Sequence, residues 1–400
     1  MPRVIRIFNR LILGGPAFNV TYLTKFLEPD FETKLLIGTK DDHEQDADFL
    51  TAQYGITPVE IPNMKRAINW TDDRAAYLQI KKIIQEYKPH IVHTHAAKPG
   101  AIGRLAASAC NVPVILHTFH GHVFHSYFGK MKTNFFIQAE RYLAKKTDRI
   151  IAISEQQKEE LTTQFNICAP EKMVVVPLGL DLEKFYTGQE SKRTRFRKQF
   201  QIHDDEIAIG IIGRIVPIKN HALFIDAVKY LLERTQQKIR IIIVGDGDQR
   251  ESLFEQLKTY HIPYNYFPED PQPKTVTFTS WLTGMDDVFA GIDIVALSSL
   301  NEGTPVSLIE AQAANKPIVT TDVGGVRDVV LDNETAFITP SGDAAAFADA
   351  LLRLTEDASL RIYMGEKGCH LVKDKFDKSR LVNDMRHLYY ELLKEKNVTF

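Results

Sequence analysis

The sequence predicts an α/β protein built from two doubly wound domains, each with a parallel sheet. Short apolar segments alternate with longer amphipathic segments along most of the 400 residues, as expected where helices join the strands of parallel sheets. The alternation stops once, at the polar and basic stretch from Gly188 to Phe200, and then begins again. We therefore expect a first domain over residues 1–190 and a second over residues 200–378.

The first expected domain opens with a strand at Arg3–Phe8, followed by a turn at Gly14-Gly15-Pro16. The other short apolar segments predict strands at Thr33–Gly38, Ile91–His95, Val114–Phe119, Arg149–Ser154 and Met173–Leu178. Amphipathic periodicity predicts helices at Ala17–Leu27, Arg74–Tyr87, Gly100–Cys110 and Thr133–Lys146.

The second expected domain repeats this alternation. Its predicted strands are Ile207–Gly213, Ile239–Gly245, Val276–Thr279, Asp293–Leu297 and Pro317–Thr321. Its predicted helices are Ala222–Glu233, Gln249–Tyr260 and Pro305–Asn315, and the last helices are expected near Ala344–Leu354 and Lys378–Lys394. Ligands bind beyond the carboxyl ends of parallel strands, so the residues after these strands are the candidates for function.

Composition excludes several classes of protein. The net charge is −2, so no overall positive charge predicts binding to nucleic acid. Three widely spaced cysteines argue against a disulfide framework and fit a reducing cytoplasm. The arginines within the first ten residues exclude a signal peptide, and no apolar stretch is long enough to predict a membrane-spanning helix.

The stretch Asn301–Val319 carries the strongest signal for a ligand site. It follows a predicted strand, and Pro305 is suited to the first helical position, which makes Thr304 the expected N-cap. The helix should then direct free amides, from about Val306 to Leu308, toward the region above the strand ends. Such an arrangement favours a phosphate group.

Two carboxylates flank this expected phosphate position. At 3.6 residues per turn, Ser307 and Glu310 share one helix face, and Leu308 lies on the opposite side. Glu310 lies roughly 9 Å along the axis from Thr304, which is close to the reach from a diphosphate to the ribose of the same nucleotide. Glu302, before the helix, can face the other end of such a ligand. The alternative interpretation is a surface loop and a helix with solvated glutamates.

Basic residues follow the first strand of the second domain. After Gly213 come Arg214 and Lys219, whose charges suit a diphosphate that gains negative charge as its bond to a sugar breaks. A solvated pair of basic side chains is the alternative. The glycines of Val244–Leu253 and of the turn Val323–Val326 are weaker signals, because glycines often serve only the turn.

Histidines gather after two strands of the first domain: His93, His95, His117, His120, His122 and His125. A metal site is disfavoured, because no acidic residue lies between Glu86 and Glu140 to complete or orient a ligand set. We expect some of these rings to pack against turns and one or two to face a ligand. His120 is the preferred candidate, because the glycine after it permits close approach.

Residues 124–146 mix aromatic side chains with lysine and arginine. A basic, aromatic helix can lie on a membrane surface, which predicts a peripheral contact through this segment. The other interpretation is a helix that packs on the sheet and exposes a solvated basic face.

Taken together, these residues resemble a known family. Glu302 and Glu310, with seven residues between them, match an E-x7-E pattern. With Gly213, Arg214, Lys219, the Val244–Leu253 segment, Gly14-Gly15 and His120, the pattern resembles the retaining GT-B glycosyltransferases of glycosyltransferase family 4 over almost the whole chain. The segments His93–Gly100 and Glu140–Ser154 resemble the bacterial surface-polysaccharide branch.

The resemblance implies two Rossmann-like domains facing across a cleft, with a nucleotide-sugar donor held mainly by the second. Arg214 and Lys219, after Gly213, would bind the diphosphate, and Glu310 the ribose. No metal or other cofactor is implied, since the two cations neutralise the leaving group. The final helix, residues 380–400, would return to the first domain.

The resemblance also assigns the sugar and the acceptor. Glu302, with the backbone of Gly303 and Thr304, would hold the donor sugar, and His120 would contact that sugar near the reacting carbon. Gly15 would approach the phosphates, and Ser307 and Leu308 complete the donor site. The acceptor would be held mainly by the first domain. Asn220, where many relatives have glycine, and the Thr304-Pro305 pair depart from the common pattern.

The leading hypothesis is therefore a retaining glycosyltransferase that transfers a sugar from a nucleotide sugar, in particular a UDP-sugar, to a glycan or a lipid-linked acceptor. It would act in the cytoplasm or at the inner face of the membrane. Two alternatives remain open: a GT-B UDP-sugar 2-epimerase, which needs no acceptor, and a binding module without catalytic activity.

Overall fold

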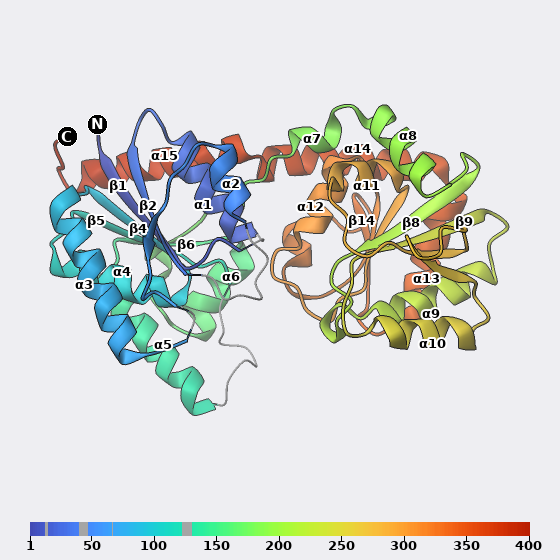
Figure 1. The fold of residues 1–400 in the computed structure, drawn as a ribbon, viewed down its shortest axis with the longest axis horizontal. Helices are drawn as coiled ribbons and strands as arrows, with labels where there is room; N and C mark the ends of the chain where they lie inside the picture. Colours follow the sequence, from blue (N-terminus) through green and yellow to red (C-terminus); the bar gives the residue numbers. More distant parts are fainter. Residues whose placement is uncertain (13–14, 40–46, 66, 122–129) are drawn as a thin grey trace. The chain divides into compact units, whose positions relative to one another are not determined.

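The computed structural model describes residues 1–12, 15–39, 47–65, 67–121 and 130–400 (Figure 1). The chain divides into two units. Unit 1 comprises Met1–Leu180 together with Phe376–Phe400, and unit 2 comprises Asp181–Lys375. The first unit is therefore built from two separate parts of the sequence.

Unit 1 contains a parallel sheet of seven strands in the order β3-β2-β1-β4-β5-β6-β7. The strands are β1 (Arg3–Phe8), β2 (Glu32–Gly38), β3 (Val59–Ile61), β4 (Ile91–His95), β5 (Val114–Thr118), β6 (Arg149–Ala152) and β7 (Met173–Val175). The order reverses between β1 and β4, which are paired directly. This doubly wound arrangement creates a crevice position at the carboxyl ends of β1 and β4.

Helices cover both faces of the unit 1 sheet. They are α1 (Gly15–Phe26), α2 (Asp48–Gln53), α3 (Trp70–Tyr87), α4 (Ala97–Ala109), α5 (Lys130–Ala144), α6 (Glu155–Glu159) and α15 (Lys378–Glu395). Val4 packs with side chains of α1 and α15, whereas its neighbour Ile5 packs with those of α3 and α4. Successive strand residues point to opposite faces, so each face of the sheet receives its own apolar cluster.

The C-terminal helix belongs to unit 1. Before α15 begins, Leu180 and Asp377 form a parallel bridge, with the Leu180 amide 2.8 Å from the Phe376 carbonyl. Both chain termini lie in this unit (Figure 1). In α15, one side of the helix from Leu381 to Leu393 is buried against the sheet. Burying such side chains stabilises by about 1.5–3 kcal/mol each, so α15 is an integral layer of unit 1.

Unit 2 contains a second parallel sheet of seven strands, in the order β10-β11-β9-β8-β12-β13-β14. Its strands are β8 (Glu206–Ile212), β9 (Lys238–Val244), β10 (Tyr264–Tyr266), β11 (Val276–Phe278), β12 (Ile294–Leu297), β13 (Ile318–Thr321) and β14 (Ala336–Thr339). Here β8 pairs with both β9 and β12. The order reverses between β8 and β12, so the crevice position of unit 2 lies beyond these two strands.

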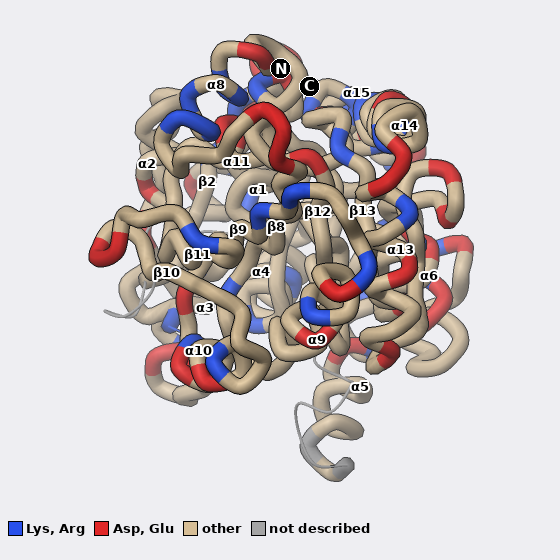
Figure 2. The backbone as a smooth tube through the Cα atoms, turned by 90° about the vertical axis from the view of Figure 1, so that its right-hand side faces the viewer, with Lys and Arg blue, Asp and Glu red and all other residues tan. Residues whose placement is uncertain are grey.

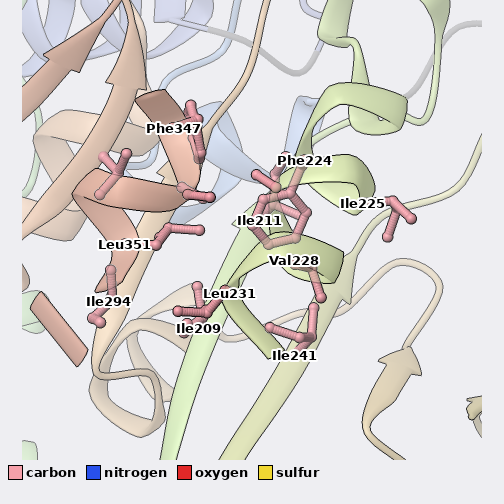
Figure 3. Close-up of a cluster of buried hydrophobic side chains, with 14 of the residues drawn as sticks. Ile209, Ile211, Phe224, Ile225, Val228, Leu231, Ile241, Ile294, Phe347 and Leu351 are labelled. Carbon is pink, nitrogen blue, oxygen red and sulfur yellow. The ribbon is translucent and has the colours of Figure 1, made fainter. Parts of the chain in front are cut away.

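The helices of unit 2 are α7 (Glu183–Tyr186), α8 (Gln189–Gln199), α9 (His221–Leu232), α10 (Arg250–Thr259), α11 (Met285–Gly291), α12 (Val306–Ala313), α13 (Ala344–Glu356) and α14 (Ala358–Phe376). Figure 3 shows the core on one face of the sheet, where Phe224 of α9 and Phe347 of α13 meet strand side chains such as Ile211. All three are almost completely buried. This core holds the ends of β8 and β9 in fixed positions.

The polar and basic stretch from Gly188 to Phe200, where the predicted alternation stops, carries α8. Phe196 is buried and packs so closely on Gly291 that a Cβ at the glycine would lie 2.1 Å from its ring. Arg197 donates to the Asp293 carboxylate at 3.1 Å. The helix is mostly polar because only two of its side chains are buried, which explains why no apolar period marked it. Unit 2 accordingly begins near residue 181 rather than 200.

Positions of basic and acidic residues are interspersed along the backbone in Figure 2. This distribution agrees with the net charge of −2. Among the described residues, no helix is both long and apolar enough to cross a membrane.

Candidate active site

The loops after β8 and β12 form the centre of the candidate site in unit 2. Lys219 Nζ lies 2.6 Å from Glu302 Oε1, and Ser299 Oγ donates to the same oxygen at 2.6 Å. The Leu300 amide also donates to the Ile218 carbonyl at 2.8 Å. Lys219 follows β8 and Glu302 follows β12, so the pair lies where the strand order reverses. The sequence predicted both residues for the site, and the structure brings them together.

The turn that carries Lys219 depends on unusual backbone conformations. Gly213 has a φ of 153°, and Asn220 adopts the left-handed conformation with φ 49° and ψ 48°. Asparagine is among the few residues besides glycine that adopt this conformation readily. The Ser298 hydroxyl donates to the Asn220 carbonyl at 2.9 Å. Asn220 therefore provides the backbone geometry that a glycine would provide at this position, so this departure from the common pattern is compatible with the turn that carries Lys219.

Arg214 follows Gly213 and is exposed. Among the described residues, no ion pair is recorded for its guanidinium. Arg214 lies in the same loop as Lys219, and an exposed guanidinium of this kind can bind an anionic ligand without first breaking an ion pair.

Helix α12 begins one residue later than predicted. Val306 is its first residue and Pro305 its N-cap, so Thr304 lies outside the helix. The Leu308 amide donates to the Pro305 carbonyl at 3.1 Å, which corrects the expectation that this amide is free. The difference arises because Pro305 has an extended conformation, with ψ at 96°, and its carbonyl closes the first turn. Ser307 lies in that first turn.

The rotation of α12 is fixed by its buried side. Leu308 and Gln312 are completely buried, and the Gln312 side chain donates to the Val329 carbonyl at 2.8 Å. Gly368 of α14 packs on Gln312 so closely that a Cβ would lie 2.9 Å from it. These contacts lie opposite Glu310 on the helix, so Glu310 is held on the side away from α14.

Part of the Glu310 side chain is exposed, but its carboxyl group is buried. This burial raises the pKa of the carboxyl to about 7. The positive charge of Lys184 opposes this rise in pKa, and the negative charge of Asp286 adds to it. Lys184 lies in α7 and Asp286 in α11, and no sequence pattern indicates that either residue would lie near Glu310. A carboxyl with a pKa near 7 can change its charge under physiological conditions.

Two glycines pack behind Glu302 and Gly303. A Cβ at Gly324 would lie 1.9 Å from the Glu302 carbonyl oxygen, and one at Gly325 would lie 2.0 Å from the Gly303 carbonyl oxygen. The Gly325 amide donates to the Glu302 carbonyl at 3.2 Å. The double glycine was ambiguous in the sequence, and the structure gives it a supporting role. Similarly, a Cβ at Gly245 would lie 2.0 Å from the Gly213 carbonyl oxygen.

In unit 1, the histidines are buried at the ends of β4 and β5. His93, His95 and His117 have no exposed surface, and His120 is half-buried just beyond β5. His95 Nδ1 lies 3.0 Å from His120 Nε2. Burial lowers the pKa of His120 to about 4 and that of His95 well below its usual value, so both rings are neutral at pH 7. Among the described residues, no group of three or more metal-ligating side chains is arranged to hold a metal ion.

The remaining predicted residues of unit 1 are only partly described. Gly15 begins α1, the first helix after β1 in the sequence. Gly14, His122 and His125 lie outside the described residues, as do residues 124–129 of the predicted membrane segment. In the described part of that segment, Met131 and Phe135 of α5 are 88% and 66% exposed. His120 and Gly15 thus belong to unit 1, and the other predicted site residues belong to unit 2.

Comparison with known proteins identifies the activity. The family model of group 1 glycosyl transferases matches residues 192–370, and that of glycosyltransferase family 4 matches residues 13–184. The chain is a GT-B glycosyltransferase. The two matches fall in unit 2 and unit 1 respectively, and together they cover both sheets.

Curated relatives of this glycosyltransferase act in the synthesis of bacterial polysaccharides and lipid-linked sugars. It is 29% identical over 338 residues to the Escherichia coli UDP-Gal:alpha-D-GlcNAc-diphosphoundecaprenol alpha-1,3-galactosyltransferase, covering 84% of each chain. It is 26% identical over 347 residues to the Staphylococcus aureus capsular polysaccharide biosynthesis glycosyltransferase CapM, covering 86% of this chain and 87% of the relative.

Solved structures share the fold of the glycosyltransferase. Anabaena HepE in complex with UDP superimposes with a TM-score of 0.80 at 18% identity, covering 98% of this chain and 100% of that one. WaaG, a glycosyltransferase of lipopolysaccharide biosynthesis, superimposes with a TM-score of 0.69 at 15% identity, covering 96% and 99%. These likenesses extend over both units.

Proposed function

We propose that this glycosyltransferase transfers a sugar from a nucleotide sugar, in particular a UDP-sugar, to a glycan or lipid-linked acceptor, with retention of the anomeric configuration. The observation that carries the proposal is the Lys219–Glu302 pair at the strand-order reversal of unit 2, beside the first turn of α12. This pair places a cation for the phosphates and a carboxylate for the sugar where doubly wound parallel sheets bind their ligands.

In this proposal, Lys219 and Arg214 bind the diphosphate of the donor. When the bond between the anomeric carbon and the phosphate oxygen breaks, the leaving diphosphate gains negative charge, which both cations stabilise. The acceptor hydroxyl forms its new bond to the anomeric carbon on the same face, and its proton passes to the leaving phosphate oxygen. No metal ion takes part in this scheme, so excess EDTA should leave the rate unchanged.

Glu302 and Glu310 would recognise the two polyhydroxyl ends of the donor. Glu302 Oε1 already accepts hydrogen bonds from Lys219 and Ser299, and Oε2 has no recorded partner among the described residues. Oε2 is therefore the atom proposed to accept a hydrogen bond from the donor sugar. Glu310 would accept from the ribose hydroxyls, and the amides of Gly303 and Thr304 would complete the sugar contacts.

The test uses the donor and acceptor named for the Escherichia coli relative. The full chain is incubated with UDP-galactose, and UDP release is measured with and without α-D-GlcNAc-diphosphoundecaprenol. We expect release that depends on acceptor, and an α-linked product in its NMR spectrum. A β-linked product would exclude retention. Isomerised sugar without acceptor would indicate an epimerase, and donor binding without any product, across a panel of nucleotide sugars and acceptors, would indicate a binding module.

A lipid-linked acceptor would bring the enzyme to the cytoplasmic face of a membrane, and we propose that α5 contacts that surface. Met131 and Phe135 are exposed apolar side chains of this helix. At its other end, Arg141, Lys145 and Lys172 line a hollow of about 480 Å³, which suits anionic headgroups. The three cysteines are free, in agreement with a reducing compartment.

Vesicle flotation tests this contact. We expect the protein to float with anionic vesicles and not with zwitterionic ones, and the double variant Met131→Ser, Phe135→Ser to lose binding by about tenfold, since each apolar side chain contributes roughly 1 kcal/mol or more. Trp281→Ser is the control, because Trp281 is also half-exposed but lies in unit 2. Equal binding of the double variant and the wild type would contradict the proposal.

A further inference from the structure

Four helices of unit 2, α7, α8, α11 and α12, pack in one group. Helix α11 contacts α7, α8 and α12, and α7 also contacts α12 (Figure 1). Phe185 of α7 and Phe289 of α11 are buried where these two helices meet, with their ring centroids 5.8 Å apart. Glu310 of α12 therefore has residues of α7 and α11 as its neighbours within the same unit.

The ammonium group of Lys192, in α8, joins three of these helices. Its Nζ lies 2.8 Å from Asp286 Oδ2 in the first turn of α11. It also donates to two carbonyls at the end of α7, that of Thr187 at 2.9 Å and that of Lys184. A lysine ammonium has three N–H groups, so each has an acceptor here. The Lys192 and Asp286 side chains are only 14% and 21% exposed, so this ion pair is better shielded from solvent than most surface pairs.

Few charges act on the Glu310 carboxyl. The two strands that contact α12, β12 and β13, contain no ionisable side chain, and α14 packs on the opposite side of α12. From α7, Lys184 favours the charged carboxylate, and from α11, Asp286 opposes it. The other acidic residues of these two helices, Glu183 and Asp287, do not act on it appreciably. Asp286, the partner of Lys192, is thus the negative charge that Glu310 has to tolerate.

A second ion pair joins α8 to α11 and offers a comparison. Arg195 Nε and Nη2 each donate to the Asp287 carboxylate at 2.6 Å. Asp287 directly follows Asp286, but successive residues of a helix point about 100° apart. The two ion pairs connect the same helices at neighbouring positions. They differ in that only Asp286 acts on Glu310.

We propose that Lys192 is a positioning residue for Glu310: by binding Asp286, it holds α7 and α11 in place and offsets the negative charge of Asp286, so that Glu310 ionises more readily. A carboxylate near a second carboxyl disfavours ionisation of that carboxyl, and a cation paired with the first reduces this effect. The value of this arrangement for catalysis rests on the proposed function, because it is there that Glu310 is assigned to the ribose.

The charge of Glu310 can be measured without substrate. The full chain is labelled with glutamate that carries ¹³C at its carboxyl carbon, and Glu310→Gln identifies the Glu310 signal by its loss. We expect the wild-type signal to titrate near pH 7. Lys192→Met should raise this midpoint by roughly half a pH unit, and Asp286→Asn should lower it by a similar amount, which is about a threefold change in proton affinity each way.

The opposite directions distinguish this role from a purely structural one. Both variants break the same ion pair, so a mere loosening of the contact between α8 and α11 would move both midpoints in the same direction. Unchanged midpoints in both variants, or changes in the same direction, would overturn the proposal. Asparagine has the shape of aspartate, so Asp286→Asn alone decides the question if Lys192→Met fails to fold, and a midpoint that is not lowered would then overturn the proposal.

Arg195→Met is the matched control. It breaks the neighbouring ion pair between the same two helices, and the Glu310 midpoint should stay that of the wild type. A change as large as that in Lys192→Met would overturn the proposal, because it would show that any break between α8 and α11 reaches Glu310.

UDP binding connects the titration to the proposed function. At pH 7 the smaller charged fraction of Glu310 in Lys192→Met should weaken UDP affinity about twofold, and at pH 9, where Glu310 is charged in both proteins, the difference should disappear. If Glu310→Gln bound UDP as tightly as the wild type at both pH values, the ribose role in the proposed function would fail. The NMR midpoints would still decide whether Lys192 controls the charge of Glu310.

Discussion

Lys219 and Glu302 form an ion pair, with Nζ and Oε1 2.6 Å apart. Their side chains are 25% and 10% exposed, so the pair is partly shielded from solvent. A donor diphosphate would therefore meet Lys219 in a position already fixed by Glu302, together with the uncompensated charge of Arg214. Groups oriented in advance stabilise a transition state without a reorganisation cost.

Removing either cation should slow transfer. We expect Lys219→Ala and Arg214→Ala each to lower kcat by at least ~10²-fold, because each removes charge stabilisation from the leaving diphosphate. Steady-state UDP release measures the effect. Lys198→Ala, which removes an exposed lysine from α8, should leave the rate unchanged. Wild-type kcat in both site variants would contradict the assignment.

Glu310 should make UDP binding depend on pH. Its carboxyl has a pKa of about 7 in the folded protein, and the charged form accepts hydrogen bonds from ribose hydroxyls more strongly than the neutral form. The UDP-induced rise in melting temperature should therefore be larger at pH 8 than at pH 6. In Glu310→Gln the rise should be smaller and independent of pH. A wild-type response that is flat between these pH values would exclude the ribose role.

The same raised pKa affects stability without ligand. The folded state holds the Glu310 proton more tightly than the unfolded state, so this contribution is complete below about pH 4.5 and is lost as the pH rises through about 7. Glu310→Gln, which cannot ionise, should stabilise the protein at pH 8 by on the order of 1 kcal/mol and have little effect at pH 5. Urea unfolding at both pH values measures this. A loss of stability at pH 8 would contradict it.

At the scale of elements, the ends of α12 and of the Glu302 loop are set by close backbone packing. Gly324 and Gly325 bring the turn after β13 directly onto the carbonyls of Glu302 and Gly303. The backbone of Glu302 and Gly303 is thus supported by two residues that have no side chain. Its position depends on the absence of two Cβ atoms.

Two single glycine substitutions distinguish the effect of close packing from the effect of backbone strain. Gly324 and Gly342 both have positive φ, 48° and 86°, but of the two only Gly324 has other atoms within 4 Å of the place that a Cβ would occupy. Gly324→Ala should lower kcat/KM by about tenfold or more, because it displaces the Glu302 loop, and Gly342→Ala should cost only about 1 kcal/mol of stability. Similar kinetic losses in both would contradict the supporting role of Gly324.

Several of these elements could be predicted from the sequence, and the reason is physical. Buried parallel strands such as β8 and β12 are short apolar runs, and Lys219 and Glu302 were recognisable because they lie in the loops that follow these two strands. The strands β3, β10 and β14 were missed; β3 and β10 are only three residues long and have a polar residue in the middle, so neither contains an apolar run. The approach of Lys184 and Asp286 to Glu310 was also beyond prediction, since it depends on how α7 and α11 pack.

At the scale of the whole molecule, unit 1 is closed by the end of the chain. The Tyr389 hydroxyl accepts a hydrogen bond from Arg6, which lies 383 positions earlier in the sequence, and it also lies within hydrogen-bonding distance of His93. Substitution of this hydroxyl removes a partner from two buried polar groups at once. Such groups are costly when left unpaired.

Tyr389→Phe should therefore destabilise the protein more than the loss of a surface hydroxyl. We expect a decrease of about 1–3 kcal/mol in the free energy of unfolding of unit 1, because both Arg6 and His93 lose a partner. Urea unfolding, followed by a probe in unit 1, measures it. Tyr390→Phe, at the neighbouring and partly exposed position, is the control and should change stability by no more than ~0.5 kcal/mol. Equal losses would contradict the role of the Tyr389 hydroxyl.

The interrupted sequence of unit 1 also has a consequence during synthesis on the ribosome. All residues of unit 2 have been made by Lys375, whereas unit 1 still lacks the helix that covers one face of its sheet. Until Tyr389 has been made, the Arg6 guanidinium lacks this hydrogen-bond acceptor. Unit 1 is thus begun first and completed second, and a nascent chain that stops between residues 376 and 388 would hold all of unit 2 but a unit 1 without Tyr389.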